Sequence, residues 1–478
     1  MIRFEAAEQE RRMEWRQLLC PKRMRQGRMS AEYDLRTEFE KDYHRILGSA
    51  SFRRMQDKTQ VFPLDRSDFI RTRLTHSLEV SSFAKSLGQS VSEQIMARGL
   101  EADFDRREAS AICDILQCAG LIHDIGNPPF GHFGETCIRE WFIRNLPSLQ
   151  FRGQPLEKLL STQQISDFYH FEGNTQAVRL VSKLHFLVDE HGMNLTFGLL
   201  GTIMKYPISS LEINRNSGQI RTKKMGYFQA DEAVFERVQR ENGTFGRRHP
   251  LTYLLEAADD IAYCTADIED AFKKGYISLG QLREELAAAD DGGDFFCLLV
   301  DILERQYTKA VDKKIDKKEA YAVQNWLVRI QGILLKEACA SFIDHYDEIM
   351  CGTYPKDLFC GSPIERIMRL LGDMAFRYVF VSRPIVGLEV ATATIFNGLL
   401  ERFVPAAICW DSDQPMTEIE KRLIAMISDN YKYVYSVYGQ DLPDEQRLYL
   451  RLLLVTDYIC GMTDSYAKDL YQRFAGIK

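Results

Sequence analysis

The sequence lacks the features of secreted, membrane-spanning and low-complexity proteins. None of its eleven cysteines forms a C-x-x-C pair, so no disulfide framework is indicated. Residues 1–5 open a charged stretch without the apolar centre of a signal peptide, and no run approaches the roughly 20 apolar residues of a membrane span. We therefore expect a cytoplasmic protein whose cysteines are reduced core residues, among them Cys113, Cys118, Cys297 and Cys460.

An excess of basic charge is also missing. The chain has 61 Lys and Arg against 68 Asp and Glu, a formal net charge of -7. This balance excludes a globally basic nucleic-acid binder but leaves a local positive pocket open. One basic cluster, consisting of Lys22, Arg23, Arg25 and Arg28, is interpreted either as a polyanion site or, preferably, as a solvated surface.

Strand patterns are scarce, and helical periodicity dominates. Apolar residues recur at three- and four-residue steps in segments 31–57, 75–98, 108–122, 135–146, 172–190 and 250–273. A further long helix begins at Asp444 and is followed by another. Only the region 210–228, with its Asn216-Ser217-Gly218 turn, predicts a β-hairpin.

Length and one break in the pattern suggest subdomains. With 478 residues, two or three are expected. The acidic, glycine-containing stretch 290–294 is the best candidate boundary. We predict a mainly α fold with an N-terminal helical segment (1–48), a core (49–290) and a C-terminal helical region (291–478).

The segment 121–135 concentrates the chemistry of the chain. An apolar run ends in His123-Asp124, and a Gly/Pro-rich loop then delivers His132 and Glu135. Adjacent His and Asp form a compact pair of metal ligands. A His followed three residues later by Glu can form a carboxylate-oriented general acid or base. The segment therefore predicts a hydrolytic site.

Further ligands are expected outside this segment. His76 begins an amphipathic helix, where a lone histidine is usually structural. Asp259, Tyr263 and Asp267 recur at four-residue steps and share a helix face. Spacing alone does not separate Asp259 from Asp260, and the shared face favours Asp259. Two imidazoles and two carboxylates suit Mn, Fe, Co, Zn or Mg, which could polarise a phosphoryl oxygen.

The pattern His76, His123-Asp124 and Asp259 resembles the metal signature of the HD phosphohydrolase superfamily. Longer blocks sharpen the resemblance, at 53–64, 71–77, 121–135, 170–174 and 457–464. Together they resemble the deoxyguanosine triphosphate triphosphohydrolases (dGTPases), in the longer enterobacterial-type branch. This resemblance implies an HD-domain helical core at 49–290, with the C-terminal region packing on it.

The resemblance implies metal-dependent hydrolysis of dGTP to deoxyguanosine and tripolyphosphate. It favours Mg or Mn as the divalent ion, with Fe, Co and Zn left open. Relatives form homo-oligomers, commonly hexamers, and respond to single-stranded DNA. Alternatives are a broad-specificity or nucleotide-activated dNTP triphosphohydrolase, an HD nucleotide phosphodiesterase, and a nucleic-acid-binding protein with a purely structural metal site.

Site residues follow from the same resemblance, position by position. The implied metal ligands are His76, His123, Asp124 and Asp259. The implied catalytic dyad is His132 with Glu135, in which His132 acts either as an acid or by direct contact with phosphorus. The implied polyphosphate contacts are Arg73, His170, Asn174, Lys205 and Tyr206. The implied sugar contacts are Gln60, Val61, Tyr263 and Asp267, the last accepting from the 3′-hydroxyl.

Overall fold

The computed structural model describes residues 4–25, 34–64, 67, 69–185, 189–289 and 294–477. Helices run through all of the longer ranges. The first are α1 (Ala6–Glu10), α2 (Trp15–Leu18), α3 (Glu38–Gly48), α4 (Ala50–Arg54), η1 (Met55–Asp57), α5 (Arg73–Arg98), α6 (Arg106–Ile122), α7 (Gly131–Asn145) and η2 (Leu146–Ser148). Next come α8 (Leu156–Leu159), α9 (Thr162–Tyr169), α10 (Gly173–Arg179), η3 (Leu180–Leu184), α11 (Phe197–Ile203), η4 (Ser210–Glu212), η5 (Ile220–Thr222), η6 (Gln229–Asp231), α12 (Glu232–Asn242), α13 (Pro250–Lys273) and α14 (Leu279–Ala289). The last are α15 (Asp294–Asp312), α16 (Lys318–Asp344), α17 (Tyr346–Cys351), α18 (Pro363–Ala375), η7 (Phe376–Phe380), α19 (Arg383–Cys409), α20 (Glu418–Met426), α21 (Asp429–Gly439), α22 (Asp444–Cys460) and α23 (Asp464–Phe474).

The helix ends follow local capping chemistry. Thr72 precedes α5 and accepts a hydrogen bond from the backbone of Thr75, and Gly99 ends that helix in a left-handed conformation with φ of 61°. Asp105 caps α6 together with Glu108. The mainly α fold class is thus confirmed, and helices occupy most of the described part of the predicted segments. Segment 31–57 is helical only from Glu38 and is divided between α3, α4 and η1, and the helix in segment 172–190 ends at Leu184. Residues 31–33 and 186–188 lie outside the described residues.

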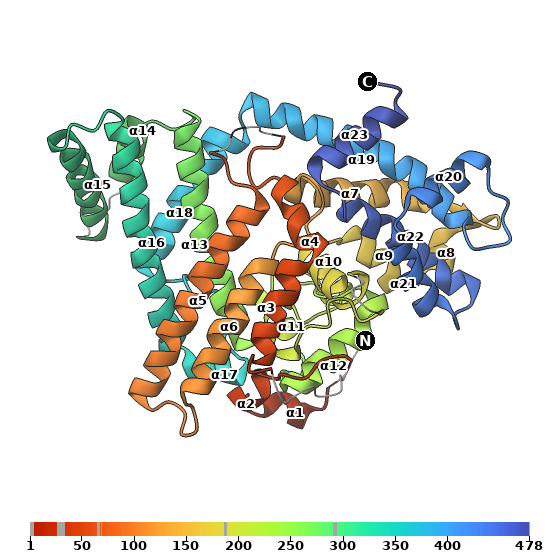
Figure 1. Ribbon diagram of the computed structural model, residues 1–478, viewed down its shortest axis with the longest axis horizontal. Coiled ribbons are helices and arrows are strands. Elements are labelled where there is room, and N and C mark those ends of the chain that lie inside the picture. Colours follow the sequence, from red (N-terminus) through yellow and green to blue (C-terminus); the bar gives the residue numbers. More distant parts are fainter. Residues whose placement is uncertain are drawn as a thin grey trace.

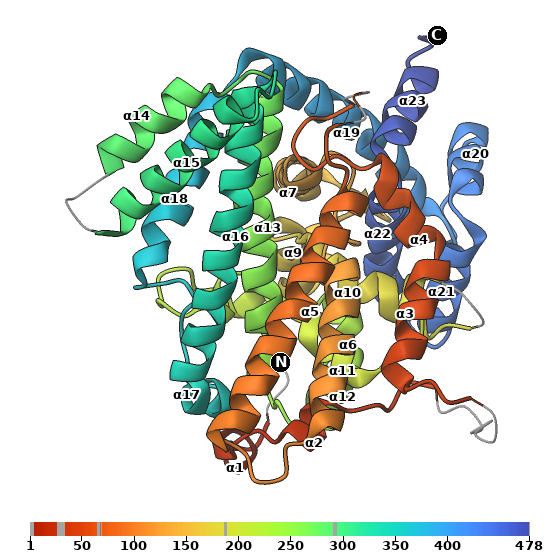
Figure 2. The same cartoon turned by 60° about the vertical axis from the view of Figure 1, so that its left-hand side comes forward.

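Two groups of helices form the molecule. In Figure 1, α16, α13, α5 and α6 lie side by side, and α5 contacts both α6 and α13. Gly120 allows close packing of α6 on α5, because a Cβ there would lie 2.5 Å from the Ser81 Cα atom. The second group gathers around α19, which contacts α7, α22 and α23 (Figure 2). The C-terminal helices therefore pack against the helix that begins with the predicted dyad.

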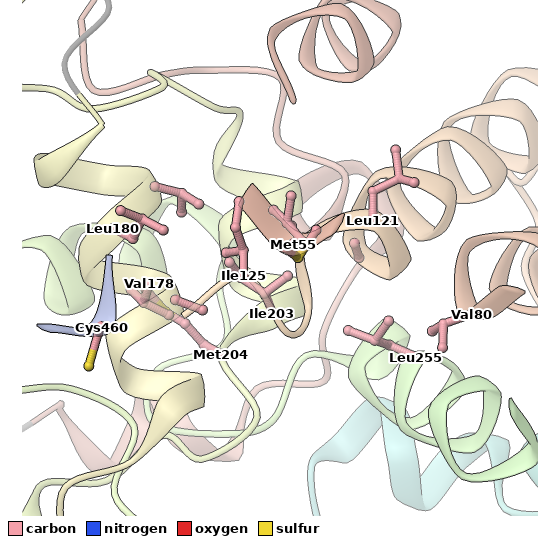
Figure 3. Close-up of a cluster of buried hydrophobic side chains, with 14 of the residues drawn as sticks. Met55, Val80, Leu121, Ile125, Val178, Leu180, Ile203, Met204, Leu255 and Cys460 are labelled. Atoms are coloured by element: carbon pink, nitrogen blue, oxygen red, sulfur yellow. The ribbon is translucent and has the colours of Figure 1, made fainter. Parts of the chain in front are cut away.

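Apolar side chains from distant segments meet beneath the 121–135 segment. Figure 3 shows Met55, Val80, Ile125, Leu255 and Cys460 within one cluster of buried side chains. Each of these residues is at most 4% exposed. The loop that follows His123-Asp124 is therefore anchored in a packed core through Ile125, which limits its movement.

The hairpin predicted at 210–228 does not form, and a short hairpin is found at 150–155 instead. The single two-stranded sheet of the described residues pairs β1 (Gln150–Phe151) with β2 (Gln154–Pro155) in antiparallel fashion. Region 210–228 instead contains the short helices η4 and η5. The turn at Gly218 does form, with φ of 72°. One backbone bond crosses the turn, from the Asn214 N–H to the Thr222 carbonyl at 2.9 Å, but no strand ladder forms, and the N–H of Ile220 donates to the Pro355 carbonyl at 2.8 Å.

The interpretation of the basic cluster as a solvated surface is wrong for Arg23. Its guanidinium is buried and donates to Glu38 at 2.8 Å and to Asp42 at 2.5 Å. Arg25 pairs with Asp189, and Lys22 donates to Glu241 at 2.9 Å. Arg23 is thus used within the fold, whereas the Lys22 side chain is 62% exposed, as predicted for a solvated surface. Arg28 lies outside the described residues.

The remaining predictions divide into outcomes of three kinds. No disulfide joins the described cysteines, and Cys118 and Cys460 are buried as expected, whereas Cys297 is exposed. Of the proposed boundary at 290–294, residues 290–293 lie outside the described residues and Asp294 begins α15, so the three-part division stays a prediction. Among the described helices, no single one is long and apolar enough to cross a membrane, although the pair Pro363–Phe380 and Arg383–Cys409, bent by 75°, passes that test jointly by length and composition.

Candidate functional site

The first turn of α5 carries two of the predicted residues. Because Thr72 caps this helix, Arg73 and His76 fall one turn apart on the same side. Both side chains are buried, with 3% of Arg73 and 1% of His76 exposed. Burial of a cation and an imidazole costs free energy unless partners compensate it. The partners come from the end of α6 and from α13.

His123 and Asp124 follow directly after α6. The His123 ring is oriented by Nδ1, which donates to the Gly120 carbonyl at 2.8 Å. This bond leaves the Nε2 lone pair available, and among the described residues that atom has no hydrogen-bond partner. Asp124 accepts from Asn127 Nδ2 at 2.8 Å and from the Arg73 guanidinium. Burial opposes its ionisation, but Arg73 and His123 hold the pKa of Asp124 below the usual range.

Asp259 reaches the same place from α13. Its Oδ1 atom lies 3.2 Å from His76 Nε2 and 3.3 Å from His123 Nε2. Its Oδ2 atom accepts from Lys205 Nζ at 3.1 Å. Despite burial, Lys205 and His123 keep the pKa of Asp259 well below its ordinary value. Asp259 rather than its neighbour Asp260 therefore completes the cluster.

These residues fit a divalent metal ion. The nearest ligand atoms of His76, His123 and Asp124 all lie within 4.8 Å of one another. The His123 Nε2 atom is buried and aimed without a hydrogen-bond partner in the described part of the chain. Two nitrogens with carboxylate oxygens form a mixed donor set of the kind that Mn, Fe, Zn and Mg accept. We call His76, His123, Asp124 and Asp259 the ligand cluster.

The predicted dyad forms at the start of α7. His132 Nδ1 donates to Glu135 Oε2 at 3.1 Å, and Glu135 Oε1 accepts from the Gly173 backbone at 2.9 Å. Glu135 is buried, whereas the His132 side chain is 68% exposed. The Glu135 hydrogen bond and charge raise the pKa of His132. The arrangement anchors one ring nitrogen and leaves the other directed away from the anchor, as proton transfer requires.

Arg73 connects the dyad with the ligand cluster. One arm of its guanidinium contacts Asp124. The other lies against the backbone that precedes His132, since a Cβ at Gly131 would be 2.3 Å from Nη2. Gly131 also has φ of 62°, a left-handed conformation that favours glycine. A single buried cation therefore touches both parts of the site.

The other predicted polyphosphate residues are spread more widely. Lys205 donates to Asp259 of the ligand cluster, and despite burial Asp259 and Glu256 raise the pKa of Lys205. Tyr206 is buried beside it, at 5% exposure. His170 is exposed and bonds only to Ser166 among the described residues. Asn174 donates to Glu172 at 2.9 Å and follows the glycine that supports Glu135.

Two of the predicted sugar residues, Gln60 and Asp267, have buried polar atoms that lack a well-formed hydrogen bond. Both carboxylate oxygens of Asp267 and the Oε1 atom of Gln60 are buried without a hydrogen-bond partner among the described residues. Burial raises the pKa of Asp267 to about 8. Val61 is buried, and Tyr263 on the same face of α13 as Asp267 is 37% exposed. Unpartnered buried polar groups are costly and are typical of ligand sites.

Sequence reasoning assigned no role to Asn127, although the segment 121–135 contains it. Its side chain orients Asp124, and its backbone oxygen accepts from the buried Lys58 at 2.6 Å. The only trace of this role in the sequence is that Asn127 follows the predicted ligand Asp124 by three residues. This spacing is too common to indicate a role without coordinates.

Comparison with known proteins agrees with this geometry. The family model of the HD domain matches residues 73–184. This range includes His76, His123, Asp124 and the dyad, and it ends before Asp259. A deoxyguanosinetriphosphate triphosphohydrolase-like protein of Listeria monocytogenes is 46% identical over 97% of this chain and 100% of its own length. The deoxyguanosinetriphosphate triphosphohydrolase of Serratia proteamaculans is 33% identical over 92% of this chain and 94% of its own length.

The chain belongs to the dGTPase family of HD-domain phosphohydrolases. The resemblance predicted from the sequence is thus confirmed. A similar protein of Synechocystis, also named deoxyguanosinetriphosphate triphosphohydrolase-like, is 36% identical over 97% of the chain. The protein is an HD-domain hydrolase related to dGTPases, and its HD domain implies a divalent metal ion.

Proposed function

We propose that the protein hydrolyses dGTP to deoxyguanosine and tripolyphosphate, with Mg or Mn held by the ligand cluster. The observation that carries the proposal is the meeting of Asp259 with His76 and His123, from segments far apart in sequence, beside the His132–Glu135 pair. The names of the relatives add support for the substrate. A bound divalent ion supplies Lewis-acid polarisation of a phosphoryl oxygen.

The residues of the chain divide the remaining work. Arg73 and Lys205 offer fixed positive charge to the triphosphate, and both are buried, where charge-assisted hydrogen bonds are strong. Glu135 anchors Nδ1 of His132, so that Nε2 of the same ring can hold or transfer a proton at the leaving 5′-oxygen or meet the α-phosphorus. His170, Asn174 and Tyr206 belong to the polyphosphate contacts of the proposal.

Selection of a deoxyribose is assigned to the predicted sugar contacts Gln60, Val61, Tyr263 and Asp267. Asp267 accepts from the 3′-hydroxyl, and Tyr263 covers the sugar with its partly exposed ring. Gln60 and Val61 line the position of C2′. A site that matches a substrate hydroxyl and crowds an extra one can discriminate strongly between nucleotides.

The test is the identity of the products. Purified protein is incubated with Mn or Mg and each dNTP, alone and in pairs, and the products are separated by ion exchange. Deoxyguanosine and intact tripolyphosphate, with dGTP preferred, support the proposal. Nucleoside monophosphate as product would replace it with a phosphodiesterase. Activation of one dNTP's hydrolysis by another would replace simple dGTP preference with a nucleotide-activated enzyme.

Two further properties are proposed from the family resemblance. The first is assembly into a homo-oligomer such as a hexamer, which light scattering coupled to size exclusion measures directly. The second is a response to single-stranded DNA, which would change the KM for dGTP when an oligonucleotide is added. A monomer at assay concentration, or unchanged kinetics with the oligonucleotide, would contradict the respective proposal.

A further inference from the structure

The connection between α22 and α23 contacts two loops that flank the site. Asp464, the first residue of α23, is 2% exposed. Its Oδ1 atom accepts from the backbone N–H of Phe130 at 2.8 Å, and its Oδ2 atom accepts from the N–H of Thr59 at 2.8 Å and from the Thr59 hydroxyl. One carboxylate therefore joins segments that lie 334 and 405 positions away in the sequence.

The contact with Phe130 bears on the dyad. Phe130 has φ of 59°, a left-handed conformation that is strained for a bulky residue. It is also the N-cap of α7 and supplies no side-chain cap of its own. Backbone strain of this kind persists only when surrounding contacts hold it. Asp464 provides such a contact two residues before His132, and so holds the backbone from which the catalytic ring projects.

The contact with Thr59 bears on the sugar side. Thr59 directly precedes Gln60 and Val61 and forms an isolated β-bridge with Thr72, the cap of α5. The backbone of this segment is thus held on one side by the helix of Arg73 and His76 and on the other by Asp464.

A buried lysine forms a second connection in parallel. Lys58 is 3% exposed, and its ammonium donates to the backbone oxygens of Asn127 at 2.6 Å and Cys460 at 2.7 Å. Cys460 is the last residue of α22, and the side chain of Asn127 orients Asp124. A buried cation bound to two carbonyl groups is an expensive way to stabilise a fold, because its desolvation is repaid only by good hydrogen bonds. These two hydrogen bonds fix the spacing between the segments that contain Lys58, Asn127 and Cys460.

We propose that Asp464 and Lys58 are positioning residues of the reaction, which hold the Phe130 turn, the Gln60–Val61 segment and the end of α22 at one fixed spacing. The C-terminal helix pair is then part of the catalytic apparatus, although no side chain of it belongs to the ligand cluster or the dyad. This inference rests on the proposed function for its kinetic readout, and on the contacts above for its structural one.

The test uses the full-length protein and the variant Asp464→Asn. An asparagine keeps the size of the side chain but offers an amide N–H where one of the backbone donors needs an acceptor. We expect kcat for dGTP to fall about 10- to 100-fold, since a small misplacement of catalytic groups costs this much, and the preference for dGTP over GTP to fall with it. Mn binding, measured without substrate, should persist.

Asp469→Asn serves as the matched control, because Asp469 is an exposed carboxylate on the same helix. It should keep the kcat of the unmodified protein. Lys58→Met is the second variant, for the case that Asp464→Asn does not fold, and it should lower kcat in the same way. A folded Asp464→Asn or Lys58→Met protein with unchanged kcat and unchanged dGTP/GTP preference would overturn the proposal.

Hydrogen exchange separates failure of this inference from failure of the proposed function. In Asp464→Asn, amides of 127–136 and of 58–62 should exchange faster together, while those of α13 keep their protection. If the unmodified protein hydrolyses no dNTP, the proposed function fails, and paired loosening of the two segments still supports the positioning role. Loosening of only one segment, or uniform loosening of the whole molecule, would contradict it.

Discussion

The two sides of the site differ in how their charges are compensated. On the side of the ligand cluster, Asp124 and Asp259 each have a cationic partner, Arg73 or Lys205, and the pKa values of both carboxyl groups are lowered. On the sugar side, Asp267 forms no salt bridge within the described part of the chain, and burial raises its pKa to about 8, although its interaction with Tyr263 opposes the rise. One side is built to carry charge permanently, while the other has polar groups that a ligand would satisfy.

Removing a charge from the ligand cluster should have the largest effect. Asp124→Ala is expected to abolish turnover, by at least about 1000-fold, and to lower metal content, because it removes a ligand and leaves Arg73 uncompensated. His132→Ala should abolish turnover to a similar degree with metal content retained. Activity assays and metal analysis of both proteins test this contrast, with Asp114→Ala on α6 as the control. Retained activity in either variant would contradict the role assigned to that residue.

On the sugar side, Asp267→Asn should weaken catalysis and yet stabilise the free protein. The folded state keeps the Asp267 carboxyl protonated up to about pH 8, whereas the unfolded chain ionises near about pH 4. Its contribution to stability is therefore lost as the pH rises from about 4 to about 8. The variant lacks this loss, so the difference in Tm between variant and unmodified protein should grow over that range.

The same variant should raise the KM for dGTP about tenfold, because an amide oxygen accepts a weaker hydrogen bond from the 3′-hydroxyl than a carboxylate does. Thermal melting at several pH values and steady-state kinetics give the two readouts. If the variant melts lower than the unmodified protein near about pH 8, the charged form of Asp267 is stabilised in the fold, as for Asp124 and Asp259, and the prediction is wrong.

A smaller effect is expected at Gln60. Gln60→Ala should lower the preference for dGTP over GTP by roughly fivefold, because one polar contact near C2′ is worth about 1 kcal/mol. The ratio of kcat/KM values for the two nucleotides measures it, and Gln56→Ala, at an exposed position of the same segment, is the control. An unchanged ratio would remove Gln60 from the sugar side.

The smallest expected effect is a shift in pH dependence at the dyad. Glu135 raises the pKa of His132, so in Glu135→Gln the limb of the kcat profile that reports this ring should move to lower pH. The direction of the limb decides the chemistry. If the ring acts as an acid, kcat falls as pH rises through its pKa, and if the neutral ring contacts phosphorus, kcat falls as pH decreases. If the limb lies at the same pH in both proteins, Glu135 does not set the pKa of His132.

Prediction from the sequence succeeded where contacts are local. The helix bounds near 75–98 and 108–122 follow from Thr72, Asp105 and Gly99, which act within one turn. It failed for the hairpin at 210–228, because the strength of a turn signal says nothing about the distant carbonyl of Pro355 that captures the Ile220 N–H. Burial of Arg23 was missed for the same reason, since its partner Asp42 comes from a separate helix.

The order of residues alone determined the family, the helical character and the kinds of donor atom available, because these depend on residue identity and on hydrogen bonds that span a few positions. The helix face shared with Tyr263 and Asp267 already favoured Asp259 over Asp260, and the structure shows that Asp259 meets the two imidazoles. Tertiary structure alone decided that a carboxylate near the C-terminus holds the turn before His132. Such contacts join positions that are hundreds of residues apart, and their geometry depends on the packing of every helix between them.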